Sequence, residues 1–161
     1  MEGVSVGFLA LARARYHSSN SADVLAALEA GAAAAIHFHP FEVVVESDGS
    51  VARIHVGQLF VANFPRYGTG LRVAPHADPH DGLLDLVAVD ASGRRSVPGL
   101  LLHLRRGTHL GRPEVTTWRA RRIAIRTRGR SPVIADSADL GSGPVLLEAL
   151  PGALRLVAPG P

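Results

Sequence analysis

Apolar and polar residues alternate in short runs over much of the chain, which is the period of a β-strand. The clearest example is FEVVVES (residues 41–47), followed by Asp48-Gly49 and then SVARIHVGQLFVANF (residues 50–64). Two apolar runs that flank Asp-Gly predict a β-hairpin. A similar alternation of Val4, Val6 and Phe8 predicts a first strand. Further strands are expected at residues 71–73, 83–89, 122–127, 133–135, 145–149 and 154–157.

Two other segments have the composition of helices. The segment DVLAALEAGAAAAIHF (residues 23–38) follows good N-cap residues, and Pro40 ends it. In SVPGLLLHLRRG, Ser96 caps a helix that Gly107 ends. Many short strands with only two helices predict a mainly β, antiparallel fold, either a β-sandwich or barrel-like. The length of 161 residues suits a single domain over residues 1–161.

Composition excludes several kinds of chemistry. The chain has no cysteine, which excludes a disulfide framework, a thiolate zinc site and a cysteine nucleophile. All 17 basic residues are arginine, and the net charge is only +3. The start has no basic segment typical of a secretory signal, and the apolar region 24–38 is too short to span a bilayer. We therefore expect a soluble, cytoplasmic protein.

The most polar cluster is APHADPHDGLLDLVAV (residues 74–89). His76, Asp78, His80 and Asp81 each carry a metal-ligating side chain, and their spacing would place three of them on one face of a strand. The prolines and the Asp-Gly pair instead favour a turn that leads into a strand. A turn rich in aspartate also suits a hard cation such as Mg²⁺ or Ca²⁺. The residues alone leave open a plain turn, an oxygen-ligand ion site and a histidine metal site.

Two further clusters are best explained by structure. His37 and His39 in IHFHP lack additional ligands, so we interpret them as residues at a helix end. The segment WRARRIAIRTRGR (residues 118–130) is rich in arginine, as nucleic-acid-binding segments are, but Ile123 and Ile125 alternate with polar positions. This pattern favours a strand with a solvated outer face, with binding to an anionic surface as the alternative. We expect no nucleic-acid partner.

No phosphate-binding motif of the Walker or dinucleotide type is present, and there is no G-x-S-x-G nucleophile elbow. Three segments nevertheless resemble one family. FVANFPRYGTGLRVAPHADPHDGLLDLVAV, LLLHLRRGTHLGRPEVTTWRARRIAI and ADSADLGSGPVLLEALPGALRLVAP resemble the C-terminal domain of the diacylglycerol kinase and sphingosine kinase superfamily, bacterial lipid kinases included. The opening EGVSVGFLA is similar to the strand that begins that domain.

The resemblance implies one half of an enzyme. Members of the family transfer the γ-phosphoryl of ATP to a lipid hydroxyl. Their N-terminal domain carries a Gly-Gly-Asp-Gly-Thr nucleotide motif, and their C-terminal domain is β-rich and helps to hold the lipid. This sequence contains no match to the nucleotide motif, so ATP would enter only through a separate nucleotide-binding domain, for example on a partner chain.

Specific residues follow from the resemblance. A structural Mg²⁺ is implied at the DGLLD turn, held by the Asp81 carboxylate and by carbonyls near Asp78 and Leu83, with His76 and His80 as bystanders. Acceptor-side residues are implied by the motif positions Asn63, Tyr67, Gly68 and Gly70.

One departure bears on catalysis. The family's Asp-Gly-Glu motif reads Asp136-Ser137-Ala138 here, so Asp136 is kept while a methyl group replaces the acidic side chain. Phosphoryl transfer uses a carboxylate to orient or deprotonate the attacking hydroxyl. Asp139 could substitute only if the turn shifted its register, because adjacent strand residues face opposite ways. We expect the chain alone to be inactive. The alternative is a lipid-binding or membrane-surface module without kinase chemistry, peripheral to the inner face of the membrane.

Overall fold

The computed structural model describes residues 1–11, 39–67, 71–90, 97–128, 131–136 and 138–153. The predicted helix at 23–38 and the predicted strand at 154–157 lie outside these residues, as do His37, Gly68 and Gly70.

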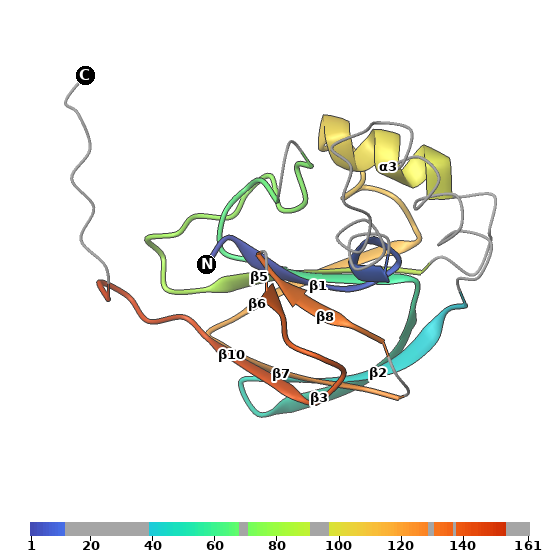
Figure 1. Cartoon of the computed structure of the whole chain (residues 1–161). Helices are drawn as coiled ribbons and strands as arrows, with labels where there is room; N and C mark the ends of the chain where they lie inside the picture. The colour runs from blue at the N-terminus through green and yellow to red at the C-terminus, as the bar shows by residue number, and fades with distance from the viewer. Residues whose placement is uncertain (12–38, 68–70, 91–96, 129–130, 137, 154–161) are drawn as a thin grey trace, which may run out of the picture.

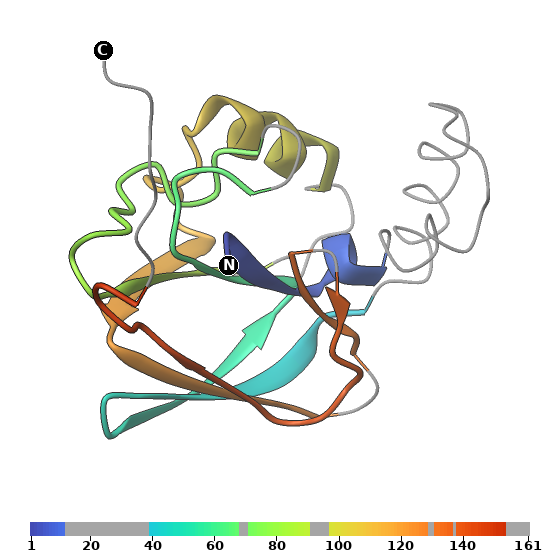
Figure 2. The same ribbon diagram turned by 60° about the vertical axis from the view of Figure 1, so that its left-hand side comes forward.

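Two antiparallel β-sheets face each other, and a helix covers the far side of the larger one, as Figure 1 and Figure 2 show. The larger sheet has the strand order β6-β5-β4-β1-β8-β9. Its strands are β1 (Gly3–Gly7), β4 (Gln58–Ala62), β5 (Leu84–Val89), β6 (Val115–Ala120), β8 (Val133–Ala135) and β9 (Ala138–Asp139).

The smaller sheet has the order β10-β7-β2-β3, and every neighbouring pair in both sheets is antiparallel. Its strands are β2 (Phe41–Ser47), β3 (Ser50–Val56), β7 (Arg122–Thr127) and β10 (Val145–Glu148). In the described part of the chain the two sheets do not close into one barrel. The β-sandwich prediction is therefore confirmed.

The core has two parts, one on each side of the larger sheet. Between the sheets, alternate residues of facing strands form an aliphatic cluster that includes Val4, Leu59, Leu86 and Ile123. The other cluster lies beneath helix α3 (Val97–Arg106) and contains the following residues: Phe60, Ala62, Tyr67, Val73, Ala74, Ala77, Val87, Val89 and Leu104. Strands β4 and β5 are buried on both faces because they contribute to both clusters.

The Asp48-Gly49 hairpin forms as predicted between β2 and β3. Both residues have positive φ angles, 45° and 87°, as a tight two-residue hairpin turn requires. The Asp48 carboxylate also accepts hydrogen bonds of 2.9 Å from the backbone amides of Arg121 and Arg122. These bonds lower the pKa of Asp48 and join the hairpin to the start of β7.

Helix α3 also matches its prediction. It ends at Arg106, and Gly107 follows with a φ of 72°, the left-handed conformation that glycine adopts at low cost. The amide of Thr108 donates to the carbonyl of His103 at 3.0 Å.

Three features differ from the strand predictions. The run 50–64 is two strands, because at Gly57 the chain passes from the smaller sheet to the larger one. Residues 71–73 form no strand; only an isolated bridge joins Tyr67 and Leu71. The third difference is two strands that were not predicted as separate elements, β6 and the short β9.

Candidate functional site

The polar segment between Ala74 and Leu83 is a series of turns stabilised by its own side chains. Asp78 Oδ1 accepts a hydrogen bond from the amide of His80 at 2.9 Å, and His80 Nδ1 lies 3.1 Å from the same oxygen. Asp81 Oδ1 accepts from the amide of Leu83 at 2.8 Å. Aspartates are common in turns for this backbone reason. Gly82, with a φ of 72°, provides the left-handed residue before β5.

A second group of charges lies where this turn meets the edge of the larger sheet. Arg119 on β6 is directly opposite Asp85 on β5. Its Nη2 donates to Asp81 Oδ2, and its Nε lies 3.4 Å from Asp85 Oδ1. Asp85 Oδ2 is buried and has no hydrogen-bond partner. Burial therefore raises the pKa of Asp85, and the nearby Arg119 charge only partly opposes this effect.

These contacts bear on the expected Mg²⁺. The Asp81 carboxylate, its proposed ligand, already accepts a backbone amide on one oxygen and the Arg119 guanidinium on the other. A divalent ion bound at Oδ2 would have to displace this guanidinium. Among the described residues, no three histidine, aspartate or glutamate side chains are grouped closely enough to hold a metal. His76 and His80 are both exposed. The Asp81 carboxylate therefore does not fit an ion while Arg119 occupies its present position, and the carbonyl ligands expected near Asp78 and Leu83 stay a prediction.

Asp136 lies in the turn after β8 with a φ of 48°. Its Oδ1 accepts hydrogen bonds from the amides of Glu2 at 2.8 Å and Gly3 at 3.0 Å, and its own amide donates to the carbonyl of Gly3 at 3.0 Å. The carboxylate thus fixes the start of β1 to the end of β8. In this arrangement Asp136 has a structural role, whatever further role it takes.

The residues that replace the acidic motif position are on the edge strand β9. Ala138 is paired with Ala135, and Asp139 with Ile134. The Asp139 carboxylate accepts the amide of Gly141 at 2.8 Å, so it caps its own turn. The substitution of Asp139 for the missing acid stays a prediction.

The acceptor-side positions separate into two environments. Asn63 directly follows β4; its amide donates to the carbonyl of Glu2 at 2.9 Å. It lines a cavity of about 170 Å³ whose other lining residues are Met1, Pro79, Gly82, Leu84, Glu148, Ala149, Leu150 and Pro151. Tyr67 is instead buried, with its ring edge-on to Phe60 at 5.7 Å and its hydroxyl 3.5 Å from the carbonyl of Ile134.

One end of the sandwich therefore brings together several predicted residues. Glu2 donates to Asp136 and accepts from the amide of Asn63. The cavity beside Asn63 is also lined by Gly82 of the DGLLD turn. Met1 and Leu150 at its rim are 54% and 66% exposed. Motif segments that are far apart in the sequence thus meet around the first residues of β1.

A histidine without an assigned role proves to be buried. His109 is 0% exposed, and its Nε2 lies 2.8 Å from the carbonyl of Val73. Its Nδ1 has no hydrogen-bond partner, and burial lowers its pKa. Together with the bond from the Arg72 amide to the Leu104 carbonyl at 2.8 Å, this contact holds α3 against the 71–77 segment. The G-x-H spacing after the helix was the only sequence signal for it.

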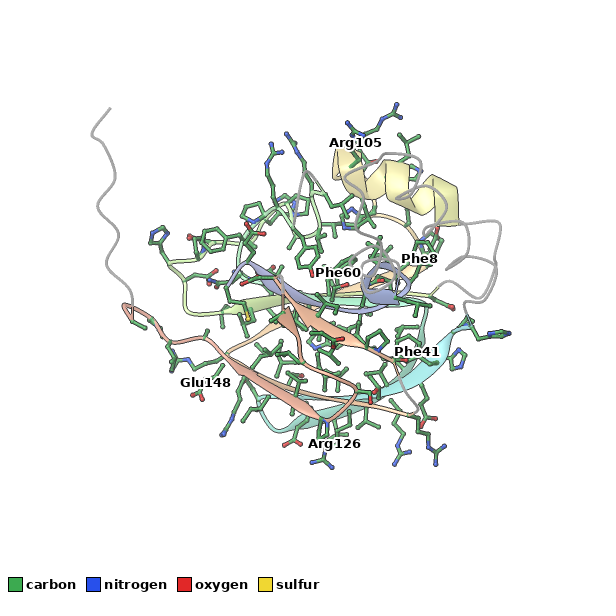
Figure 3. All side chains as sticks on the ribbon, viewed as in Figure 1. Phe8, Phe41, Phe60, Arg105, Arg126 and Glu148 are labelled. Atoms are coloured by element: carbon green, nitrogen blue, oxygen red, sulfur yellow. The ribbon has the colours of Figure 1, made fainter. Side chains whose placement is uncertain are left out.

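The arginines of residues 118–128, the part of this segment that the structure describes, do not form one patch. Arg119 faces the α3 side, whereas Arg122 and Arg126 project from the outer face of β7, and Ile123 and Ile125 are buried between them. Figure 3 shows Arg126 and Glu148 on this outer side, away from Arg105 on α3. A shallow hollow of about 720 Å³ lies over the same face and includes Glu46 as well as arginine. The prediction of a strand with a solvated face is confirmed.

Comparison with known proteins places the chain in a family. Residues 2–158 match the family described as the YegS C-terminal NAD kinase beta sandwich-like domain. The chain belongs to this family, whose members include lipid and diacylglycerol kinases.

Individual relatives agree with this assignment. A protein of Bacillus subtilis (strain 168) named "Putative lipid kinase YtlR" is 30% identical over 120 residues, which cover 74% of this chain and 39% of the relative. A diacylglycerol kinase of Mycobacterium tuberculosis (strain CDC 1551 / Oshkosh) is 31% identical over 123 residues, which cover 74% and 38%. The chain thus matches about two fifths of the length of each curated relative.

A solved structure shares the fold. The crystal structure of a diacylglycerol kinase from Bacillus anthracis str. Sterne superposes with a TM-score of 0.55 at 16% identity, covering 92% of this chain and 46% of that one. In the described part of the chain, no helix has the length and apolar character needed to cross a bilayer.

Proposed function

We propose that this chain is the acceptor-side domain of a lipid kinase, which supports ATP-dependent phosphorylation of a diacylglycerol or sphingoid lipid only together with a nucleotide-binding domain. The family membership and the names of the relatives support this proposal. So does the share of each relative that the chain matches, which leaves about three fifths of their length for the nucleotide-binding part.

The observation that carries the proposal is the convergence at one end of the sandwich. Asn63 and the DGLLD turn lie at the two ends of one motif segment, and Asp136 lies in another. Backbone contacts through Glu2 or a shared cavity bring them together. The exposed Met1 and Leu150 side chains give this end an apolar rim. A surface of this kind suits a partner domain on one side and an acyl chain on the other.

Ala138 limits what the domain contributes. A methyl group neither orients nor deprotonates an attacking hydroxyl, and the Asp139 carboxylate is used by its own turn. We therefore propose that this domain holds the lipid but supplies no general base. The working complex would act at the inner surface of the membrane, as a peripheral cytoplasmic protein.

A chimera tests the proposal. The matching C-terminal part of the Mycobacterium tuberculosis diacylglycerol kinase is replaced by this chain, and transfer of labelled γ-phosphate from ATP to diacylglycerol in phospholipid vesicles is measured. With Ala138 we expect transfer above that of the nucleotide-binding domain alone but far slower than that of the parent kinase. Ala138→Glu should raise the rate by about 10²–10⁴-fold, the usual contribution of a general base. The matched variant Ala138→Gln, of the same size but without basicity, should not.

The second candidate is a lipid-binding module without kinase chemistry, which the alanine at position 138 favours. Vesicle flotation of the unmodified chain distinguishes the two. Binding to diacylglycerol vesicles together with an inactive Ala138→Glu chimera would favour the binding module. If the chain does not float with vesicles and the Ala138→Glu chimera is also inactive, both candidates are wrong.

A further inference from the structure

The turn at residues 78–83 has a protein cation at the position where the family resemblance places a metal ion. Asp81 Oδ2 accepts the Arg119 guanidinium, while Oδ1 accepts the amide of Leu83. Arg119 also contacts Asp85, which is directly opposite it on the neighbouring strand. One guanidinium therefore lies between two carboxylates and joins the turn to the edge strand β6.

Burial makes this arrangement different from an ordinary surface ion pair. The side chain of Asp81 is 25% exposed and that of Asp85 only 15%. Surface pairs contribute little because water screens them, whereas partly buried charges need a close counter-charge. Without Arg119, the two aspartates would face each other with no cation between them.

Charge balance also argues against an ion in addition to Arg119. One guanidinium already offsets part of the charge of the two carboxylates that it contacts. A divalent cation at Asp81 would lie against the guanidinium and would be repelled by it. Mg²⁺ further demands near-octahedral oxygen ligands, and the Arg119 guanidinium beside Asp81 Oδ2 has only donors and cannot supply one.

We infer that Arg119 replaces the divalent ion at this turn, so that the domain folds and keeps its DGLLD geometry without a metal. Planar, always-charged arginine suits this position because one guanidinium contacts two carboxylates in fixed directions. The inference is independent of the proposed function, because it concerns the stability of the turn and requires no lipid or nucleotide.

Thermal unfolding of the purified chain tests it. The wild-type melting temperature should agree within about 1 °C in EDTA and in 10 mM Mg²⁺ or Ca²⁺ at constant ionic strength. Arg119→Gln should melt several degrees lower in EDTA, and either ion should restore about 3–8 °C, since an ion well above its dissociation constant stabilises the state that binds it. Arg126→Gln removes the same charge from the outer face of β7 and serves as the matched control, with no response to either ion.

A binding measurement keeps the inference falsifiable if Arg119→Gln does not fold. Trp118, the single tryptophan, lines the same cavity of about 300 Å³ as Asp85 and Arg119, so it can sensitise the luminescence of bound Tb³⁺. The wild type should show no sensitised emission from an ion at Asp81, so Asp81→Asn should leave the emission unchanged. Wild-type emission abolished by Asp81→Asn, or a wild-type melting temperature several degrees higher in Mg²⁺, would overturn the inference in favour of a metal site.

Discussion

The hydrogen bonds of Asp136 can be measured separately from its backbone conformation. Three substitutions separate the two effects. Asp136→Asn keeps a side-chain acceptor and tolerates the φ of 48°; Asp136→Gly keeps the conformation but loses the acceptor; Asp136→Ala loses both. The series therefore assigns a free energy to the attachment of β1 to β8, on which the candidate site depends.

The structure sets the expected magnitudes. A hydrogen bond to a charged group contributes about 1.5–3 kcal/mol. The hydrogen bond from the Glu2 amide is exposed, so water can replace it in the variant and little free energy is lost. The hydrogen bond from the Gly3 amide is partly buried and should account for most of the loss. We expect Asp136→Gly to lose about 2 kcal/mol of unfolding free energy. Alanine should lose about 1 kcal/mol more because of the left-handed backbone, and asparagine should lose less than about 1 kcal/mol.

Urea unfolding followed by the fluorescence of Trp118 is the assay, since this single tryptophan is packed against the core between the sheets. At a slope of about 2 kcal/mol per molar urea, a loss of 2 kcal/mol lowers the midpoint by about 1 M. Equal midpoints for wild type and Asp136→Gly would refute the contribution of the carboxylate. Equal midpoints for the glycine and alanine variants would refute the contribution of the backbone conformation.

Three further predictions concern the stability of the fold. Burial lowers the folded-state pKa of His109 below its usual value near 6.5, so the unfolded chain binds more protons than the folded one. The free energy of unfolding should therefore fall as the pH drops below about 6.5, by at most about 1.4 kcal/mol per pH unit. His109→Phe should flatten this pH dependence, and an unchanged slope in the variant would contradict the prediction. Gly82→Ala should lower the free energy of unfolding in urea by about 2–4 kcal/mol, because its Cβ would lie 2.8 Å from the Pro151 side chain. Gly141→Ala, with a similar φ but open surroundings, should lower it by about 1 kcal/mol. Equal losses for the two variants would exclude the steric cause. Leu104→Ala, on the buried side of α3, should cost about 2–5 kcal/mol of unfolding free energy. Leu102→Ala, on the half-exposed side of the same helix, should cost less than about 1 kcal/mol, and similar losses would show that α3 is not packed as described.

The sequence predicted elements whose signals are local. The hairpin at Asp48-Gly49 depends on the turn residues themselves, and strand β7 on the alternation of Ile123 and Ile125 with arginine. Helix α3 was predicted from its flanking residues because a left-handed glycine ends it. In each case the information lies within about ten residues of the element.

The rest depends on contacts between distant residues. The passage of the chain between sheets at Gly57 interrupts a continuous apolar run, so periodicity alone joins β3 and β4. The pairing of Arg119 with Asp85 follows from strand register, which the sequence does not specify. Likewise, the backbone amides that Asp136 binds lie more than 130 positions away in the chain. Motif resemblance found these aspartates but did not indicate their partners.

The crossing at Gly57 has a consequence for cooperativity. Residues 50–62 contribute β3 to the smaller sheet and β4 to the larger one, with only Gly57 between the two strands. The Gly57 amide donates to the carbonyl of Val89 at 2.8 Å, and its carbonyl accepts the amide of Phe8 at 3.2 Å, so the crossing itself is fastened at both ends. We therefore expect the two sheets to unfold together, in one cooperative transition. A protein cut between residues 50 and 62 would therefore yield two fragments, neither of which contains all the strands of either sheet.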